Sequence, residues 1–164
     1  MRYFITFSCY GHHLHGDQSG SVGRDHNLPG SRLLLHNPDR IEAEHHLMDQ
    51  LPYSLNQRCR TVVLDALRQV CIHRGWTLLA AHVRSTHVHV IVDAEVQPEK
   101  IMNDFKSYAS RRLNRSGLEE PNRKRWARHG STQWLWTDGD TRSAVRYVIE
   151  EQGETMAAFV AECI

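Results

Sequence analysis

The spacing of apolar residues along the chain separates strand-like from helix-like segments. Residues 2–10 are almost all β-branched or aromatic, which predicts a strand. Two further apolar runs, 77–83 and 88–92, are separated by a short polar turn and predict a tight antiparallel hairpin. Residues 131–137 predict a fourth strand.

Three segments carry apolar residues at helical spacing instead. Residues 54–74 predict a helix with Ser54 as its N-cap and Gly75 as its stop. Residues 97–116 predict a second helix and residues 141–152 a third.

A long connection follows the first strand. Residues 11 to about 53 are rich in Gly, His, Asn and Pro and predict a loop with one short helix around residues 39–50. A histidine group in this loop (His12, His13, His15) matches no known zinc spacing, so a second metal site is not favoured.

The resulting order is β–α–β–β–α–β–α. This order indicates an α+β fold: a ferredoxin-like antiparallel sheet with the helices packed on one face. A chain of 164 residues fits a single domain, 1–164, with a core of its own. The fold alone selects no function, because many activities share this scaffold.

Composition narrows the class of protein. No apolar run reaches the roughly 20 residues that span a bilayer, and no cleavage site follows the N-terminus, so a cytoplasmic protein is expected. The four cysteines lack a CxxC pair and are predicted to be free thiols.

The charge is unevenly distributed, although the net charge is only +1. Residues 100–128 carry nine basic and three acidic side chains, which indicates contact with a polyanion such as a nucleic acid. A solvated basic helix would produce the same pattern.

The first group with chemical potential is His87-Val88-His89. Alternate residues of a strand face the same side, so both imidazoles could bind one divalent metal. If Ser85-Thr86 is a two-residue turn, His82 pairs with His89 and lies on the same face. The alternative is a pair of polar residues on an exposed strand face.

The second group surrounds Tyr108, at the edge of the apolar stripe of helix 97–116. Its flank is shared by one acidic and three basic residues: Asp104, Arg111, Arg112 and Arg115. Tyr108 is either an amphipathic packing residue or a phenol presented to a phosphodiester that the arginines hold.

These motifs occur in an order that resembles a known family. The segments 3–7, 85–92 and 105–114, together with 147–151, resemble the IS200/IS605-like and REP-associated tyrosine transposases, which are single-tyrosine HUH endonucleases. The resemblance extends from residue 3 to about 152. A His-hydrophobe-His strand followed by a Lys-x-Tyr helix is more specific than either part alone.

The resemblance implies a mechanism. His87 and His89 would bind Mg²⁺ or Mn²⁺, and Tyr108 would attack single-stranded DNA to form a 5′-phosphotyrosine and a free 3′-OH. It implies single-stranded DNA, hairpins included, as the partner and a nucleoid-associated protein that is a monomer or a homodimer.

The third metal ligand departs from the family pattern. In related transposases a Gln or Asn one helical turn after the tyrosine completes the site, but Arg112 stands there in this chain. Asp104 and His82 are the two candidates to replace it.

Seven basic residues are expected to follow the DNA backbone, with Trp134 as a stacking platform. They are Lys106, Arg111, Arg112, Arg115, Arg123, Lys124 and Arg125. Core packing is the alternative for the tryptophan, and a solvated loop is the alternative for residues 123–125.

Two other functions fit the same residues. One is a non-catalytic nucleic-acid-binding module, which has no need of His87, His89 and Tyr108 together. The other is a metal enzyme acting on a small substrate, whose activity would survive Tyr108→Phe.

Overall fold

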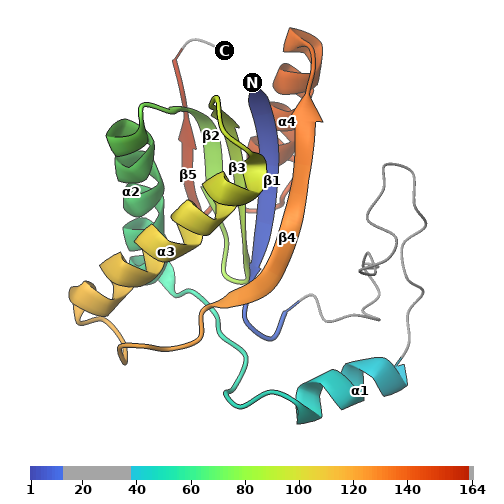
Figure 1. Cartoon of the computed structure of the whole chain (residues 1–164), viewed down its shortest axis with the longest axis vertical. Coiled ribbons are helices and arrows are strands. Elements are labelled where there is room, and N and C mark those ends of the chain that lie inside the picture. Colours follow the sequence, from blue (N-terminus) through green and yellow to red (C-terminus); the bar gives the residue numbers. More distant parts are fainter. Residues whose placement is uncertain (13–37, 163–164) are drawn as a thin grey trace.

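The computed structural model describes residues 1–12 and 38–162, and its centre is a five-stranded sheet (Figure 1). The strands are β1 (Arg2–Cys9), β2 (Thr77–Val83), β3 (His87–Asp93), β4 (Trp126–Leu135) and β5 (Ala157–Val160). The helices are α1 (Pro38–His46), α2 (Gln57–Arg74), α3 (Pro98–Ser116) and α4 (Asp138–Glu150). Most of the histidine-rich loop, with His13 and His15, lies outside the described residues.

The strands are arranged in the order β4-β1-β3-β2-β5, and every neighbouring pair is antiparallel. The predicted α+β fold with an antiparallel ferredoxin-like sheet is therefore confirmed. The predicted hairpin is present too, and His82 pairs with His89 across it. The short edge strand β5 was not predicted, because four residues give no readable alternation.

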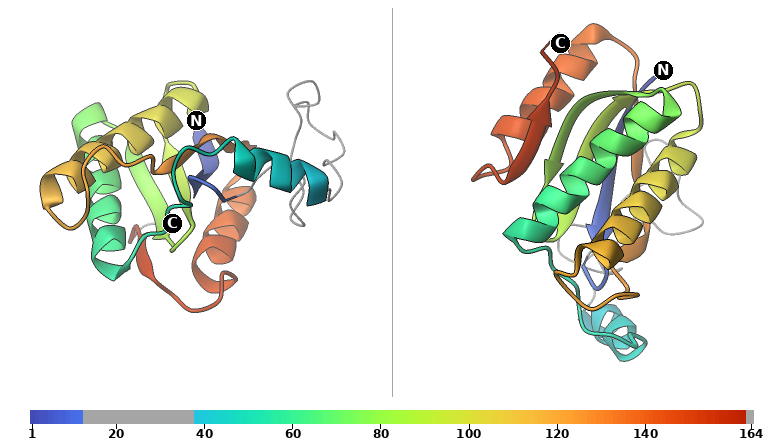
Figure 2. Two further views of the ribbon diagram at one scale, coloured as in Figure 1. Left: turned by 90° about the horizontal axis from the view of Figure 1, so that it is seen from below. Right: turned by 90° about the vertical axis from the view of Figure 1, so that its left-hand side faces the viewer.

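The helices cover both faces of the sheet, which corrects the prediction that all of them share one face (Figure 2). α2 and α3 pack on one side, here called the α2/α3 face, and α4 packs on the other, the α4 face. The reason lies in β3, where Val88 and Val90 belong to one buried cluster and Ile91 to the other. A central strand that is apolar on both sides needs cover on both sides.

Local signals fix the ends of the helices. α2 is capped by the Asn56 side chain, which accepts from the Cys59 amide, so the predicted Ser54 cap was wrong by two residues. Thr137 and Asp140 form a reciprocal capping box at the start of α4. Gly75 and Gly117 adopt the left-handed conformation that ends α2 and α3.

Two of the composition-based predictions can be compared with the structure. Cys9, Cys59 and Cys71 are buried free thiols, as expected. Within the described part of the chain, no helix has the length and apolar character needed to cross a membrane.

Candidate active site

His87 and His89 lie side by side on the α4 face, near the start of β3. Their ring centroids are 4.8 Å apart. The ring of His89 also lies 5.6 Å from that of Phe4, a residue packed against the α4-side cluster. The strand alternation thus brings both imidazoles to one place, as the sequence predicted.

His89 is held from two sides. Its Nδ1 lies 2.8 Å from the Thr6 hydroxyl, and its Nε2 lies 3.2 Å from the Gln152 side-chain oxygen. Burial, with a smaller contribution from the neighbouring His87, lowers the pKa of His89 to about 4. The ring is therefore neutral near pH 7 and offers a lone pair, which a metal ligand requires.

Gln152 is the third donor at this place. Its amide nitrogen lies 3.4 Å from the Tyr147 carbonyl, to which it donates, and this contact turns the amide oxygen toward His89. The described residues contain no group of three His, Cys, Asp or Glu side chains suited to a metal, so the third ligand here would be an amide.

The donor set fits a small divalent cation. His89 Nε2 and Gln152 Oε1 lie 3.2 Å apart, so both atoms would be within reach of one ion. A Thr6 oxygen beside Nδ1 can accept the ring proton and leave Nε2 free for the ion. Amide oxygen suits Mg²⁺ and Mn²⁺, whereas imidazole nitrogen suits transition metals, so the mixed set favours Mn²⁺ of the two.

Tyr147 stands next to this group on α4. Its ring lies 6.0 Å from the ring of His89 and 6.0 Å from that of Phe4, and the side chain is 42% exposed. An accessible phenol therefore lies beside the histidine pair, in the last turn of α4, and Gln152 follows just beyond the end of this helix.

Tyr108 lies on the opposite face of the sheet from the two histidines. It packs against the buried cluster of the α2/α3 face, where its ring lies 6.1 Å from His73 and 4.5 Å below the Arg111 guanidinium. The sheet separates it from His87 and His89, which corrects the expectation that these three residues form one site within the chain.

Neither candidate for the third ligand is placed to bind a metal. Asp104 of α3 forms ion pairs with Arg74 of α2 at 3.1 Å and with Lys100 at 3.3 Å, on the α2/α3 face. His82 lies on the same face as His89 but is fully buried, and both of its ring nitrogens have protein partners. Both assignments are therefore wrong in this structure.

Lys106 was expected to touch DNA but points into the protein. Its ammonium donates to the carbonyls of Ala127 (2.9 Å) and His129 (3.2 Å) and lies 3.5 Å from that of Arg128. Burial lowers the pKa of Lys106 to about 8. Lys106 fixes the start of β4 and is not available to a phosphate.

We expect Lys106→Met to destabilise the fold by about 1–3 kcal/mol, because three carbonyls lose a buried charged donor. DNA affinity of the folded variant should be unchanged. Urea denaturation followed by titration with labelled DNA checks both results, and a stable variant with weakened DNA binding would contradict this role.

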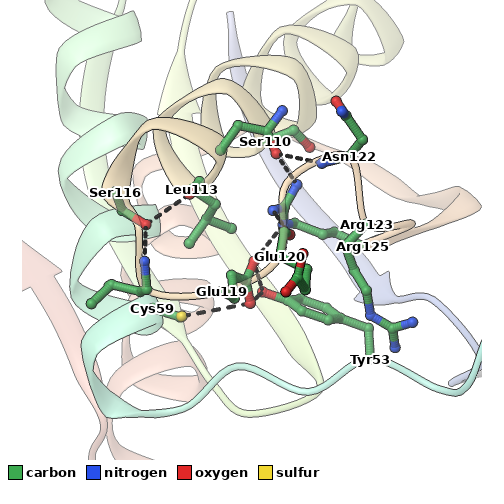
Figure 3. Close-up of polar contacts among 12 residues, drawn as sticks. Tyr53, Cys59, Ser110, Leu113, Ser116, Glu119, Glu120, Asn122, Arg123 and Arg125 are labelled. Carbon is green, nitrogen blue, oxygen red and sulfur yellow. Dashed lines mark hydrogen bonds and ion pairs between the residues drawn. The ribbon is translucent and has the colours of Figure 1, made fainter.

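Arg125 is buried as well and belongs to an internal polar network (Figure 3). It contacts Glu119 at 2.6 Å and Asn114 at 2.8 Å, while the Tyr53 hydroxyl donates to the same Glu119 carboxylate. Its assignment as a DNA contact is wrong. The network ties the loop before β4 to the segment that enters α2.

The two neighbouring basic residues also have partners in the protein. Arg123 donates to the carbonyls of Leu51 and Pro52, and Lys124 forms an ion pair with Asp49. Lys124 remains exposed, so a contact with DNA stays a prediction for it.

The remaining candidates are exposed on the α2/α3 side of the molecule. Arg111, Arg112 and Arg115 lie on the outer surface of α3. Trp134 contacts Tyr3 of the α2/α3-face cluster and stacks on Trp136 with ring centroids 5.3 Å apart. Their roles in DNA binding stay predictions.

The pKa of His89 predicts how the metal-free protein responds to acid. In the unfolded chain His89 is protonated below about pH 6.5, whereas in the folded protein it is protonated only below about pH 4. The free energy of unfolding should therefore fall by up to about 3 kcal/mol between these values. Urea denaturation across this range, with His89→Gln as the control, measures the effect; an equal pH slope in both proteins would contradict it.

Comparison with known proteins places the chain in a family. Residues 52–152 match the model of the family described as "Transposase IS200 like". This segment contains the histidine pair, Tyr108, Tyr147 and Gln152. No curated protein matches the chain.

Two solved structures are similar in fold. One is a REP-associated tyrosine transposase bound to a REP hairpin, with 13% identity and a TM-score of 0.48; the match covers 90% of this chain and 63% of that one. The other is a predicted transposase from Deinococcus radiodurans R1, with 16% identity and a TM-score of 0.46, covering 93% and 90%. The chain thus spans less than two thirds of the first structure.

The family match covers more than half of the sequence and the whole histidine–tyrosine site. The chain therefore belongs to the IS200-like transposase family.

Proposed function

We propose that the protein cuts and rejoins single-stranded DNA with Tyr147 as its nucleophile. The observation that carries this proposal is the convergence of three residues at His89 on the α4 face: the Tyr147 ring lies 6.0 Å from the His89 ring, and the Gln152 side-chain oxygen lies 3.2 Å from His89 Nε2. The family match supports the class of reaction, and the position of Tyr147 beside His89 supports the choice of this tyrosine.

His87, His89 and Gln152 would hold the divalent metal. When bound, a Mg²⁺ or Mn²⁺ ion supplies Lewis-acid polarisation of the scissile phosphate. Thr6 orients His89, and the Tyr147 carbonyl orients Gln152, so each of these two ligands has a second contact that fixes its direction.

The covalent step exchanges one phosphoester bond for another and therefore needs no external energy source. The Tyr147 oxygen attacks the phosphorus and loses its proton to solvent, while the bond from phosphorus to the 3′-oxygen breaks and this oxygen takes up a proton from solvent. The products are a 5′-phosphotyrosine and a strand with a free 3′-OH. Reversal by a 3′-OH joins a strand and releases the tyrosine, which would account for strand transfer.

The surface of the sheet beside the histidine pair suits a nucleic-acid strand. α4 ends at Glu150, and the sheet beyond it presents small polar side chains on the same face, among them Thr6 and Ser131, which pair across β1 and β4. Ser131 is exposed. Hydroxyl groups can contact phosphates without selecting a base.

The test is a covalent trap. The protein is incubated with 5′- and 3′-labelled single-stranded DNA, including hairpins, with and without Mn²⁺, and resolved on a denaturing gel. We expect an adduct that carries the label lying 3′ of the cut and forms only with metal. Binding without an adduct across a broad pool of sequences would contradict the proposal and favour a non-catalytic binding module.

A further inference from the structure

His82 is a completely buried histidine whose two ring nitrogens are both occupied. Its Nδ1 lies 2.8 Å from the Val148 carbonyl, and its Nε2 lies 3.0 Å from the Met156 amide. A backbone amide can only donate, and a carbonyl can only accept. The ring is therefore the neutral tautomer with its proton on Nδ1, and it bridges α4 to the segment just before β5.

Arg84 adds a third attachment just beyond the end of the same strand. Its guanidinium donates to the Glu154 carbonyl at 3.0 Å. Arg84 follows the last residue of β2, and its amide donates to the His87 carbonyl, so the pairing continues and its side chain lies on the same face as that of His82. Together they hold the irregular residues 151–156, here called the return segment, over the end of the hairpin.

The backbone groups that His82 and Arg84 contact lie close in the chain to the proposed active-site residues. Val148 directly follows Tyr147, while Glu154 and Met156 follow Gln152 closely in the chain. Beyond the Glu151 amide, which donates to the Tyr147 carbonyl at the end of α4, the segment is assigned neither to a helix nor to a strand. The contacts made by His82 and Arg84 therefore hold the chain on both sides of Gln152, whose side chain contacts His89.

We propose that His82 is a positioning residue for the active site: by bridging the Val148 carbonyl and the Met156 amide, it sets where Tyr147 and Gln152 stand against His87 and His89. The effect of His82 on metal binding and cleavage rests on the proposed function, whereas the hydrogen-exchange test of the bridge does not. His82 itself ligates nothing and does not touch the DNA.

The bridge explains why a histidine occupies a fully buried strand position. A leucine would fill similar space but would remove the ring partner of the buried Val148 carbonyl and of the part-buried Met156 amide. Asparagine can reproduce the Nδ1 contact, and glutamine can reproduce the Nε2 contact, so each conservative variant should restore one end of the bridge.

The structural test is hydrogen exchange of the Met156 amide in the metal-free protein. We expect about tenfold or faster exchange in His82→Leu, because one lost hydrogen bond shifts a local opening by about that factor. His82→Gln should restore much of the protection. The matched control is Val83→Ala, a cavity variant on the α2/α3 face, which should leave this amide unchanged. Unchanged exchange in His82→Leu would overturn the proposal.

The functional test is Mn²⁺ affinity, measured calorimetrically well below the unfolding temperature. His82→Leu and Gln152→Ala should each weaken binding about tenfold, and the double variant should bind no more weakly than either. Val83→Ala should bind like the original protein. Additive losses would show that His82 does not act through Gln152 and would overturn the positioning role.

The two proposals fail in different ways. If the unaltered protein binds no Mn²⁺ and forms no adduct, the proposed function fails, while the exchange result still decides whether His82 holds the return segment. If the adduct forms normally in His82→Leu at the original Mn²⁺ dependence, the positioning role fails and the proposed function stands.

Discussion

Replacing Tyr147 with phenylalanine is expected to abolish the covalent protein–DNA adduct while DNA affinity stays within about twofold of the original. The variant loses one oxygen atom from a side chain that is 42% exposed, so the fold should keep its stability within about 0.5 kcal/mol. The phenol that lies beside the histidine pair is removed, while its ring position against His89 is kept. The rate of adduct formation should fall by at least about a thousandfold.

Tyr108→Phe is the matched control. This tyrosine is also partly exposed on a helix, but it packs on the α2/α3 face beside His73 and Arg111. Its loss should leave adduct formation within about twofold, because the sheet lies between it and the histidine pair. The account is wrong if Tyr108→Phe stops cleavage and Tyr147→Phe does not.

The second large effect is expected at the metal. His89→Ala should weaken Mn²⁺ binding by more than about a hundredfold and reduce cleavage to background, because it removes a central ligand. Gln152→Ala should weaken Mn²⁺ binding about tenfold, since a neutral amide is the weakest donor of the three proposed ligands. Calorimetric titration with Mn²⁺, followed by the gel assay at saturating metal, measures both quantities.

Asp104→Asn serves as the control for this series. Its carboxylate is engaged with Arg74 and Lys100 on the opposite side of the sheet, so Mn²⁺ affinity should be unchanged. If Asp104→Asn weakened metal binding as much as His89→Ala does, the ligands would have to be reassigned to α3.

The predictable parts of the molecule were those encoded by short-range periodicity. Alternation on β3 placed His87 and His89 together, and the two-residue turn at Ser85-Thr86 set the pairing of His82 with His89. Gly75 and Gly117 marked the ends of two helices. These features depend on a few neighbouring residues, which the sequence displays directly.

The choice of tyrosine could not be read in the same way. Helical spacing shows which side of α3 or α4 is apolar, but it does not show which face of the sheet each helix covers. Tyr108 and Tyr147 therefore appear equivalent until Val148 is seen to pack with Ala80 and Ile91. The signal that was available was the resemblance of residues 147–151 to the family, which includes Tyr147 itself.

Burial of charged residues was the other feature that local patterns concealed. Lys106 and Arg125 contribute to a basic segment in the sequence, yet both are buried and bonded internally. Their partners, the carbonyls of β4 and the carboxylate of Glu119, are brought near only by the tertiary fold. Local charge therefore overstated the surface available to DNA.

The most direct measurement is to identify which residue carries the DNA. Wild-type protein is trapped on single-stranded DNA with Mn²⁺, the adduct is digested with protease and nuclease, and the modified peptide is sequenced by tandem mass spectrometry. The account predicts a nucleotide joined through its 5′-phosphate to Tyr147, in the peptide that also contains Val148. The same modification on Tyr108 would contradict it.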